Sequence, residues 1–144
     1  MLATRLKRDL YGQVVTGDWA KKRDTGGIFN VEDATAENPR AQQGDISATL
    51  PLYGKKVRIS PYEAGVLELE TLAHFGLRWV DFTGRRGSRR PSRIFLEDVL
   101  LTPEPDGYTL AFTLPKGTFA TSVLREIMKV EVDEPLSEGE DDED

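Results

Sequence analysis

The sequence contains no cysteine, and its single histidine is His74. The lack of cysteine excludes disulfides, thiolate nucleophiles and cysteine-ligated metal sites, and one histidine alone cannot form a metal-binding cluster. No apolar run approaches the roughly 18 residues of a membrane span, and the first ten residues are polar, unlike a secretory signal. We therefore expect no metal or other cofactor, no membrane association and a cytoplasmic location.

Acidic residues outnumber basic ones by 25 to 19, so the formal net charge is -6. Residues 131–144 hold 9 of the acidic residues and no Lys or Arg, so residues 1–130 carry 19 basic and 16 acidic residues, a net charge of +3. A segment this charged and this poor in apolar groups cannot pack into a core. We expect residues 131–144 to form a disordered acidic tail behind a mildly basic body.

Short strand patterns and a few helix patterns follow one another without regular alternation, which indicates an α+β fold. Residues 1–10 predict a helix with a leucine every fourth residue on its inner side and Arg5 outside. Residues 33–44 predict a second helix that Pro39 interrupts and a glycine ends.

The clearest helix pattern covers residues 61–75. Ser60 is a candidate N-cap residue, and Glu63 would complete a capping box. Apolar residues recur at helical spacing and predict the packing face. These residues are Tyr62, Val66, Leu69, Leu72 and Ala73. Residues 77–83 then alternate in polarity like a strand.

Residues 84–93 contain five arginines separated by glycine, serine and proline. These arginines are Arg85, Arg86, Arg89, Arg90 and Arg93. Guanidinium groups bind phosphate oxygens through paired hydrogen bonds, and a clustered basic patch binds polyanions by releasing their counterions. The stretch is therefore a candidate RNA-binding loop, although composition alone equally fits a solvated basic loop without a ligand.

Strand patterns resume after residue 94, and the Pro/Gly-rich segment 103–107 predicts the turn of a β-hairpin. The returning strand alternates Leu110, Phe112 and Leu114 with more polar positions. Pro115 and Gly117 then allow a sharp turn into a helix, for which Thr118 is a plausible N-cap residue.

The start of this last helix is the best candidate binding site in the sequence. A helix N-terminus presents free backbone N–H groups, and Lys116 adds a mobile cation, a combination that suits a phosphate. Phe119 offers a face on which a base can stack. The alternative is an ordinary β-turn-α connection with Phe119 packed in the core.

The segment from Phe112 to Glu126 resembles the C-terminal signature of the TruD family of tRNA pseudouridine synthases. Its matching pattern is Phe-x-Leu-Pro-Lys-Gly-x-Phe-Ala-Thr-x-Val-Leu-Arg-Glu. Residues 2–19, residues 45–54 and the pair Arg89-Arg90 also resemble family segments, so the likeness covers residues 1 to about 130.

By this resemblance, residues 1–95 belong to the family's inserted domain and residues 96–130 form the last hairpin and helix of its catalytic domain. Phe119 would then contact the target nucleotide, Lys116 and Arg125 would serve the RNA backbone or the frame of the pocket, and the arginines of residues 84–93 would hold tRNA. The family carries its nucleophilic aspartate in a Gly-x-Lys-Asp-type motif, which this sequence lacks. The resemblance therefore implies no catalytic residue in this chain.

Two functional hypotheses follow. In the first, the chain is the C-terminal fragment or subunit of a tRNA pseudouridine synthase that works with a separately encoded N-terminal half. In the second, it is a non-catalytic or vestigial RNA-binding protein. For the isolated chain, the missing nucleophile favours the second.

Overall fold

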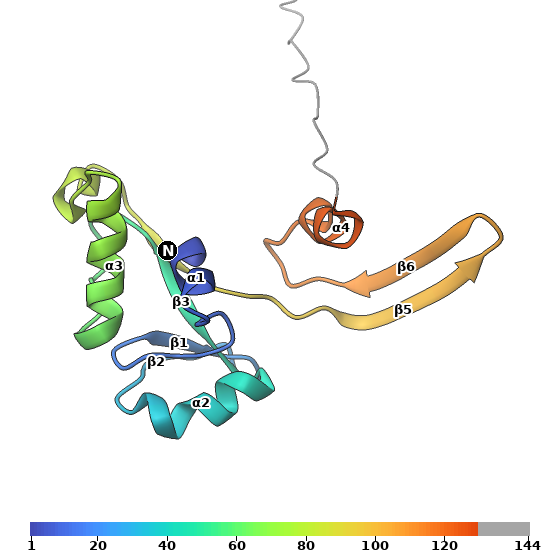
Figure 1. Cartoon of the computed structure of the whole chain (residues 1–144), viewed down its shortest axis with the longest axis horizontal. Helices are drawn as coiled ribbons and strands as arrows, with labels where there is room; N and C mark the ends of the chain where they lie inside the picture. Colours follow the sequence, from blue (N-terminus) through green and yellow to red (C-terminus); the bar gives the residue numbers. More distant parts are fainter. Residues whose placement is uncertain (130–144) are drawn as a thin grey trace, which may run out of the picture. The chain divides into compact units, whose positions relative to one another are not determined.

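A computed structural model describes residues 1–129 of the chain, and the predicted acidic tail lies outside the described residues. The chain divides into two compact units, residues 1–94 and a second unit that begins at Phe95. Helices and antiparallel strands are mixed along the chain (Figure 1), which confirms the predicted α+β class.

The first unit is a four-stranded sheet with helices around it. Its strands occur in the order β2-β1-β3-β4, and each neighbouring pair is antiparallel. The elements in chain order are α1 (Leu2–Lys7), β1 (Trp19–Lys22), β2 (Ile28–Asn30), α2 (Ala34–Gln43), β3 (Ile46–Leu52), α3 (Tyr62–His74), the 3-10 helix η1 (Trp79–Phe82) and β4 (Ser88–Pro91).

Helix α2 covers one face of this sheet. Asp33 caps the helix by accepting hydrogen bonds from the N–H groups of Thr35 and Ala36, and Gly44 ends it in the left-handed conformation. The helix runs through Pro39 without a break, so the predicted interruption is wrong. Small side chains let the helix approach the strands closely, and the buried core there consists of Val14, Ala20, Val31, Ala41, Ile46 and Ala48.

Helix α1 is anchored by an ion pair and not by its leucines. Arg5, predicted to face outward, is only 1% exposed, whereas Leu2 and Leu6 are exposed. Both terminal nitrogens of Arg5 donate to the carboxylate of Asp18, at 2.6 and 3.0 Å. Asp18 also accepts from the N–H of Val15 at 2.8 Å, so its charge is well compensated.

Helix α3 turns a different face inward from the one that its sequence predicts. Tyr62, Val66 and Leu69 are exposed, and Leu72 alone of the predicted packing face is buried. The buried residues of the helix are Ala64, Gly65, Leu67, Glu68, Thr71 and Leu72. Ser60 does not cap the helix, because its hydroxyl and its N–H both donate to the carboxylate of Glu68.

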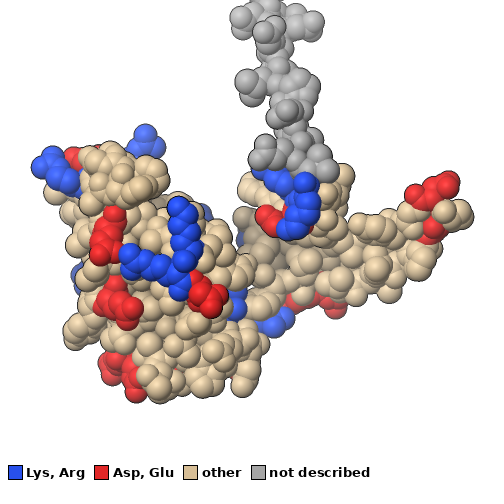
Figure 2. All heavy atoms as spheres, viewed as in Figure 1, with Lys and Arg blue, Asp and Glu red and all other residues tan. Residues whose placement is uncertain are grey.

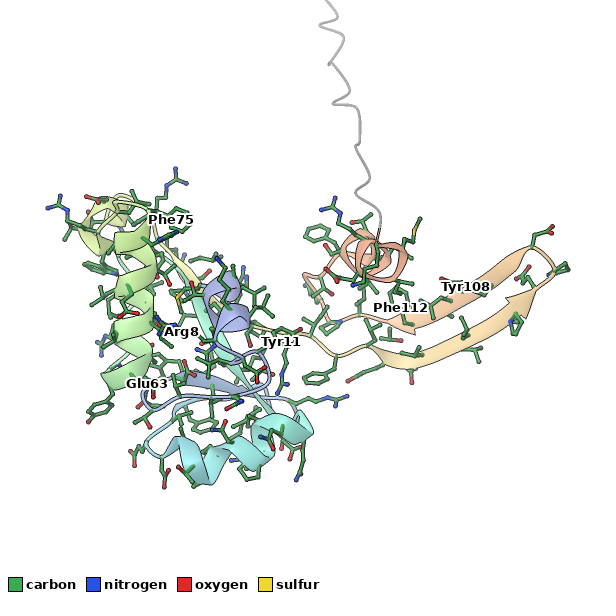
Figure 3. All side chains as sticks on the ribbon, viewed as in Figure 1. Arg8, Tyr11, Glu63, Phe75, Tyr108 and Phe112 are labelled. Atoms are coloured by element: carbon green, nitrogen blue, oxygen red, sulfur yellow. The ribbon has the colours of Figure 1, made fainter. Side chains whose placement is uncertain are left out.

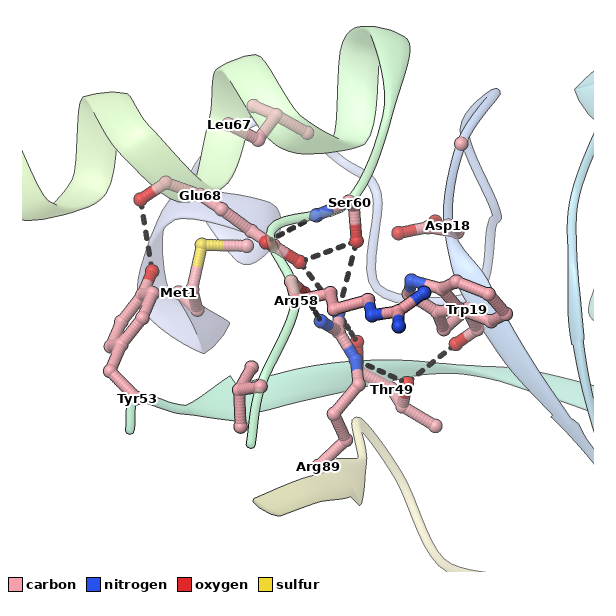
Figure 4. A network of polar contacts seen from close by, with 12 residues as sticks. Met1, Asp18, Trp19, Thr49, Tyr53, Arg58, Ser60, Leu67, Glu68 and Arg89 are labelled. Carbon is pink, nitrogen blue, oxygen red and sulfur yellow. Dashed lines mark hydrogen bonds and ion pairs between the residues drawn. The ribbon is translucent and has the colours of Figure 1, made fainter. Parts of the chain in front are cut away.

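The same carboxylate joins α3 to the sheet (Figure 4). Arg89 of β4 donates to Glu68 at 2.5 Å, and the side chains of Arg89 and Glu68 are 12% and 1% exposed. The guanidinium also donates to the hydroxyl of Ser60 and to the hydroxyl and carbonyl oxygens of Thr49 on β3. On the far side of Glu68, the hydroxyl of Tyr53 donates to its backbone carbonyl at 2.9 Å. One carboxylate thus connects strand, loop and helix.

The segment from Leu77 to Thr83 is not the predicted strand. It contains the short helix η1, whose start is fixed by Asp81. The carboxylate of Asp81 accepts from the N–H and the guanidinium of Arg78. This local pairing satisfies the backbone and favours a turn over a strand.

The second unit consists of a hairpin and a helix, and none of its described residues is buried. Strands β5 (Glu97–Glu104) and β6 (Gly107–Thr113) pair in antiparallel fashion, as predicted, and α4 spans Ala120–Met128. Phe112 lies near the α4 end of the hairpin and Tyr108 toward its tip (Figure 3). The predicted cap at Thr118 is wrong, because its hydroxyl donates to the carbonyl of Pro115 and Phe119 occupies the N-cap position.

The buried ion pair between Arg5 and Asp18 predicts a large loss of stability in Asp18→Asn. The change leaves the positive charge of Arg5 buried without its partner, which should cost about 3 to 5 kcal/mol. Chemical denaturation of the native chain and of Asp18→Asn measures the difference in their free energies of unfolding. Glu70→Gln is the control, because the ion pair between Arg8 and Glu70 is half exposed and should contribute less than about 1 kcal/mol.

The environment of Tyr53 predicts a loss of stability in alkali. Burial, with the nearby carboxylate of Glu68, raises the pKa of Tyr53 to about 12 from the ordinary value of 10.0. The folded state therefore favours the protonated phenol. The contribution of Tyr53 to the free energy of unfolding is complete below pH 10 and declines as the pH rises toward about 12. Denaturation midpoints across this range should fall more steeply in the native chain than in Tyr53→Phe. Tyr62→Phe, at an exposed tyrosine, should keep the native pH profile.

Candidate nucleic-acid interface

The arginine-rich stretch is folded into the first unit and is not a free loop. Residues 88–91 form β4, which pairs with β3 so that Ser88 lies opposite Leu52 and Arg90 opposite Leu50. Just before β4, the carbonyl groups of Arg85 and Arg86 accept hydrogen bonds from the N–H groups of Lys55 and Lys56, at 2.8 and 2.9 Å. Two basic segments that are distant in sequence therefore run side by side.

Two glycines permit this close approach. A Cβ atom at Gly54 would lie 2.4 Å from the backbone nitrogen of Gly87, and one at Gly87 would lie 2.7 Å from the Cα of Gly54. Gly87 also has a φ of +70°, which few other residues adopt without strain. The backbones touch directly because neither residue has a side chain.

The result is a cluster of exposed cations that we call the basic surface. It comprises Lys55, Lys56, Arg58, Arg85 and Arg86. None of these side chains forms an ion pair with a residue in the described range 1–129. Sequence reasoning missed the three members from residues 55–58, although the run Lys-Lys-x-Arg was a visible signal. These three residues are distant in sequence from residues 84–93, so the sequence did not show that the two basic segments lie side by side.

The remaining predicted arginines differ in their surroundings. Arg89 is occupied by Glu68 and Thr49 inside the first unit. Arg93 donates to Ser47 and to backbone carbonyl groups of residues 41 and 46. Burial lowers the pKa of its guanidinium, and the nearby Tyr11 opposes this effect. Arg90 is exposed, and its place next to Arg89 on the strand directs it to the opposite face of the sheet.

The second candidate site lies in the second unit. Lys116 stands in the turn after β6, Phe119 is at the N-cap position of α4, and Arg125 lies in the second turn of that helix. All three side chains are exposed, and Phe119 is 72% exposed. Phe119 is therefore not packed into a core of the second unit.

Elsewhere the charges of the first unit are mixed. On the face shown in Figure 2, Lys and Arg side chains gather over α1, and Asp and Glu side chains lie over α3 next to them. The tip of the hairpin in the second unit carries Glu104 and Asp106. In the described part of the chain, Asp, Glu and His side chains form no group of three that could hold a metal ion. None of the helices in residues 1–129 has the length and apolar character that a membrane crossing requires.

Comparison with known proteins identifies relatives over almost the whole described range. The family model "tRNA pseudouridine synthase D (TruD)" matches residues 1–127. A tRNA pseudouridine synthase D of Thermus thermophilus is 51% identical over 130 residues, which cover 90% of this chain and 36% of the relative. That of Anaeromyxobacter dehalogenans (strain 2CP-1) is 40% identical over 138 residues, covering 93% of this chain and 39% of the relative.

A solved structure has the same fold. The crystal structure assigned to tRNA pseudouridine synthase D (TruD) from Methanosarcina mazei matches with a TM-score of 0.66 and 24% sequence identity, covering 90% of this chain and 35% of that one. The chain thus spans little more than a third of the length of these relatives. The match over residues 1–127 confirms the resemblance carried by the segment 112–126, and the chain belongs to the TruD family of tRNA pseudouridine synthases.

Proposed function

We propose that this chain is the RNA-holding part of a TruD-type tRNA pseudouridine synthase. The observation that carries the proposal is the basic surface, in which backbone hydrogen bonds hold Lys55 and Lys56 beside Arg85 and Arg86. Exposed cations without acidic partners attract the phosphate backbone of RNA and gain from the release of its counterions. Arg90 adds a further exposed cation. Arg89 and Arg93 are instead bound to Glu68 and Ser47 inside the first unit.

In the complete enzyme, an aspartate would attack the uridine, and the detached base would turn and rejoin through carbon 5 without a cofactor. The sequence contains no Gly-x-Lys-Asp-type motif to supply this aspartate. The nucleophile would then come from the remaining part of the enzyme, in a separately encoded N-terminal half. Alone, the chain would bind RNA without converting its uridine to pseudouridine, as a non-catalytic RNA-binding protein would. Its location would be the cytoplasm.

The two units would serve different domains of the enzyme. Residues 1–95 would be part of the inserted domain, and residues 96–130 would complete the catalytic domain. The proposal is supported by the division of the chain at residue 94 and by the absence of any buried residue among the described ones of the second unit. A two-stranded hairpin is only marginally stable alone, so its apolar side chains favour packing against the rest of that domain.

Within the catalytic domain, Phe119 would contact the target nucleotide after it leaves the RNA stack. The ring of Phe119 is exposed beside a helix start, where Lys116 adds a cation. Arg125, farther along α4, would contact the RNA backbone or support the frame of the pocket.

Neutralising the basic surface should weaken tRNA binding and its salt dependence. In the triple variant Lys55→Gln, Lys56→Gln and Arg86→Gln, each lost phosphate contact should lower the slope of log affinity against log salt by about 0.7 on single-stranded and about 0.9 on duplex RNA. Filter binding of unmodified tRNA at several salt concentrations gives these slopes.

The matched control is Lys7→Gln, Arg8→Gln and Arg40→Gln, which changes the net charge equally at other positions of the first unit. It should leave most of the affinity and the slope intact. Equal losses in the two triple variants would show that only net charge matters, and the basic surface would lose its special role.

Phe119→Ala should abolish turnover and leave stability nearly unchanged. The side chain is mostly exposed, so its loss should change the free energy of unfolding by less than about 0.5 kcal/mol. The measurement is pseudouridine formation by the chain combined with the nucleophile-bearing part of a TruD synthase, together with thermal melting of the chain.

Phe112→Ala removes the same ring from the half-buried face of β6 and is the matched control. It should lower the melting temperature and retain turnover below it. If Phe119→Ala melts as early as Phe112→Ala and still modifies tRNA at the normal rate, Phe119 has no place in the site.

A further inference from the structure

A small hollow opens on the first unit where the segment after β3 meets the sheet. Its volume is about 240 Å³, and it is lined by Trp19, Ile28, Lys56, Val57, Arg58 and Ser88, with Arg89 beside them. This is slightly below the range of about 300 to 1,000 Å³ that is typical of small-molecule sites. The hollow suits one planar group and not a larger ligand.

One wall of the hollow is apolar because of the alternation along β1. Asp18 and Ala20 turn inward and are buried, so Trp19 between them faces the opposite side of the sheet and is partly exposed. Ile28 of β2 also reaches this side and is 55% exposed. The backbone of Trp19 is tied to β3, because its carbonyl accepts a hydrogen bond from the hydroxyl of Thr49 at 2.6 Å.

Other residues that line the hollow carry positive charge. Lys56 and Arg58 are exposed, and neither forms an ion pair with any residue in the part of the chain that the structure describes. Arg89 adds no free charge, because Glu68 neutralises its guanidinium. The backbone carbonyl groups of Val57 and Arg58 accept hydrogen bonds from Trp79 and Arg89. The segment that carries the two cations is thereby fixed.

We propose that this hollow binds one unpaired nucleotide of the RNA, with the base against Trp19 and the phosphate at Lys56 and Arg58. Aromatic rings accept bases of any identity by stacking, and nearby cations neutralise the backbone of the same strand. Lys56 belongs to both the hollow and the basic surface, so an RNA strand on the surface continues directly into the hollow. The inference rests on the proposed function, in which RNA is the ligand of this chain. It adds that the hollow selects single-stranded RNA over duplex RNA.

Trp19 is one of two tryptophans in the sequence, and it can therefore report on its own site. Trp79 has to stay in place, because its indole N–H donates to the carbonyl of Val57 between the two cations. The fluorescence that the native chain shows and Trp19→Phe lacks is that of Trp19. Titration with a short single-stranded oligouridylate should quench this fluorescence to saturation, since a stacked base contacts the indole. A blunt RNA duplex should bind the basic surface and leave the fluorescence nearly unchanged.

Affinity gives an independent measurement. Trp19→Leu keeps an apolar side chain but removes the stacking face, so it should weaken oligouridylate binding roughly 5- to 150-fold. Trp19→Phe keeps a ring and should retain most of the affinity, and neither change should affect duplex binding. Phe75→Leu is the matched control at another exposed aromatic, and it should bind oligouridylate as the native chain does.

Each opposing result has a distinct meaning. If Trp19→Leu binds oligouridylate as tightly as the native chain and the fluorescence of Trp19 does not change, the hollow is not a nucleotide site, while salt-dependent tRNA binding would still support the proposed function. Equal quenching by an oligoglutamate peptide would also overturn the inference, because no base would then be needed. Failure of every RNA to bind would overturn the proposed function together with it.

Discussion

The contact between Glu68 and Arg89 is the constraint on which the first unit depends. An unpaired charge at either position would be buried at a cost of several kcal/mol, so α3 and β4 must come together with both groups in place. Ser60, Thr49 and Tyr53 complete the hydrogen bonding around the pair. Because β4 is fixed in this way, the arginines that precede it have a fixed position on the surface.

The fold class and the hairpin could be predicted because they follow from local patterns. Alternating polarity and a Pro/Gly turn define the hairpin of residues 97–113, and its partner strand is adjacent in sequence. The inner face of α3 could not be predicted in the same way. There the apolar residues Tyr62, Val66 and Leu69 are exposed, and the helix instead buries Glu68, whose charge is paired with an arginine from a distant strand.

Of the two candidate sites, one follows from a local sequence pattern and the other depends on long-range contacts. A motif of fifteen consecutive positions placed Phe119 at a helix start, and the structure has it there. The basic surface needed the fold, since the pairing of residues 55 and 56 with residues 85 and 86 is a long-range contact that depends on Gly54 and Gly87. Composition alone also could not separate Arg86, which is exposed, from Arg89, which holds the interior together.

The long-range origin of the basic surface ties ligand binding to folding. An unfolded chain keeps all the same lysines and arginines, but the two basic segments are then about thirty residues apart and do not act as one surface. An anionic ligand that requires both segments binds the folded chain more tightly than the unfolded one, and by mass action it shifts the folding equilibrium toward the native state. A ligand of the basic surface would therefore stabilise the fold that creates this surface.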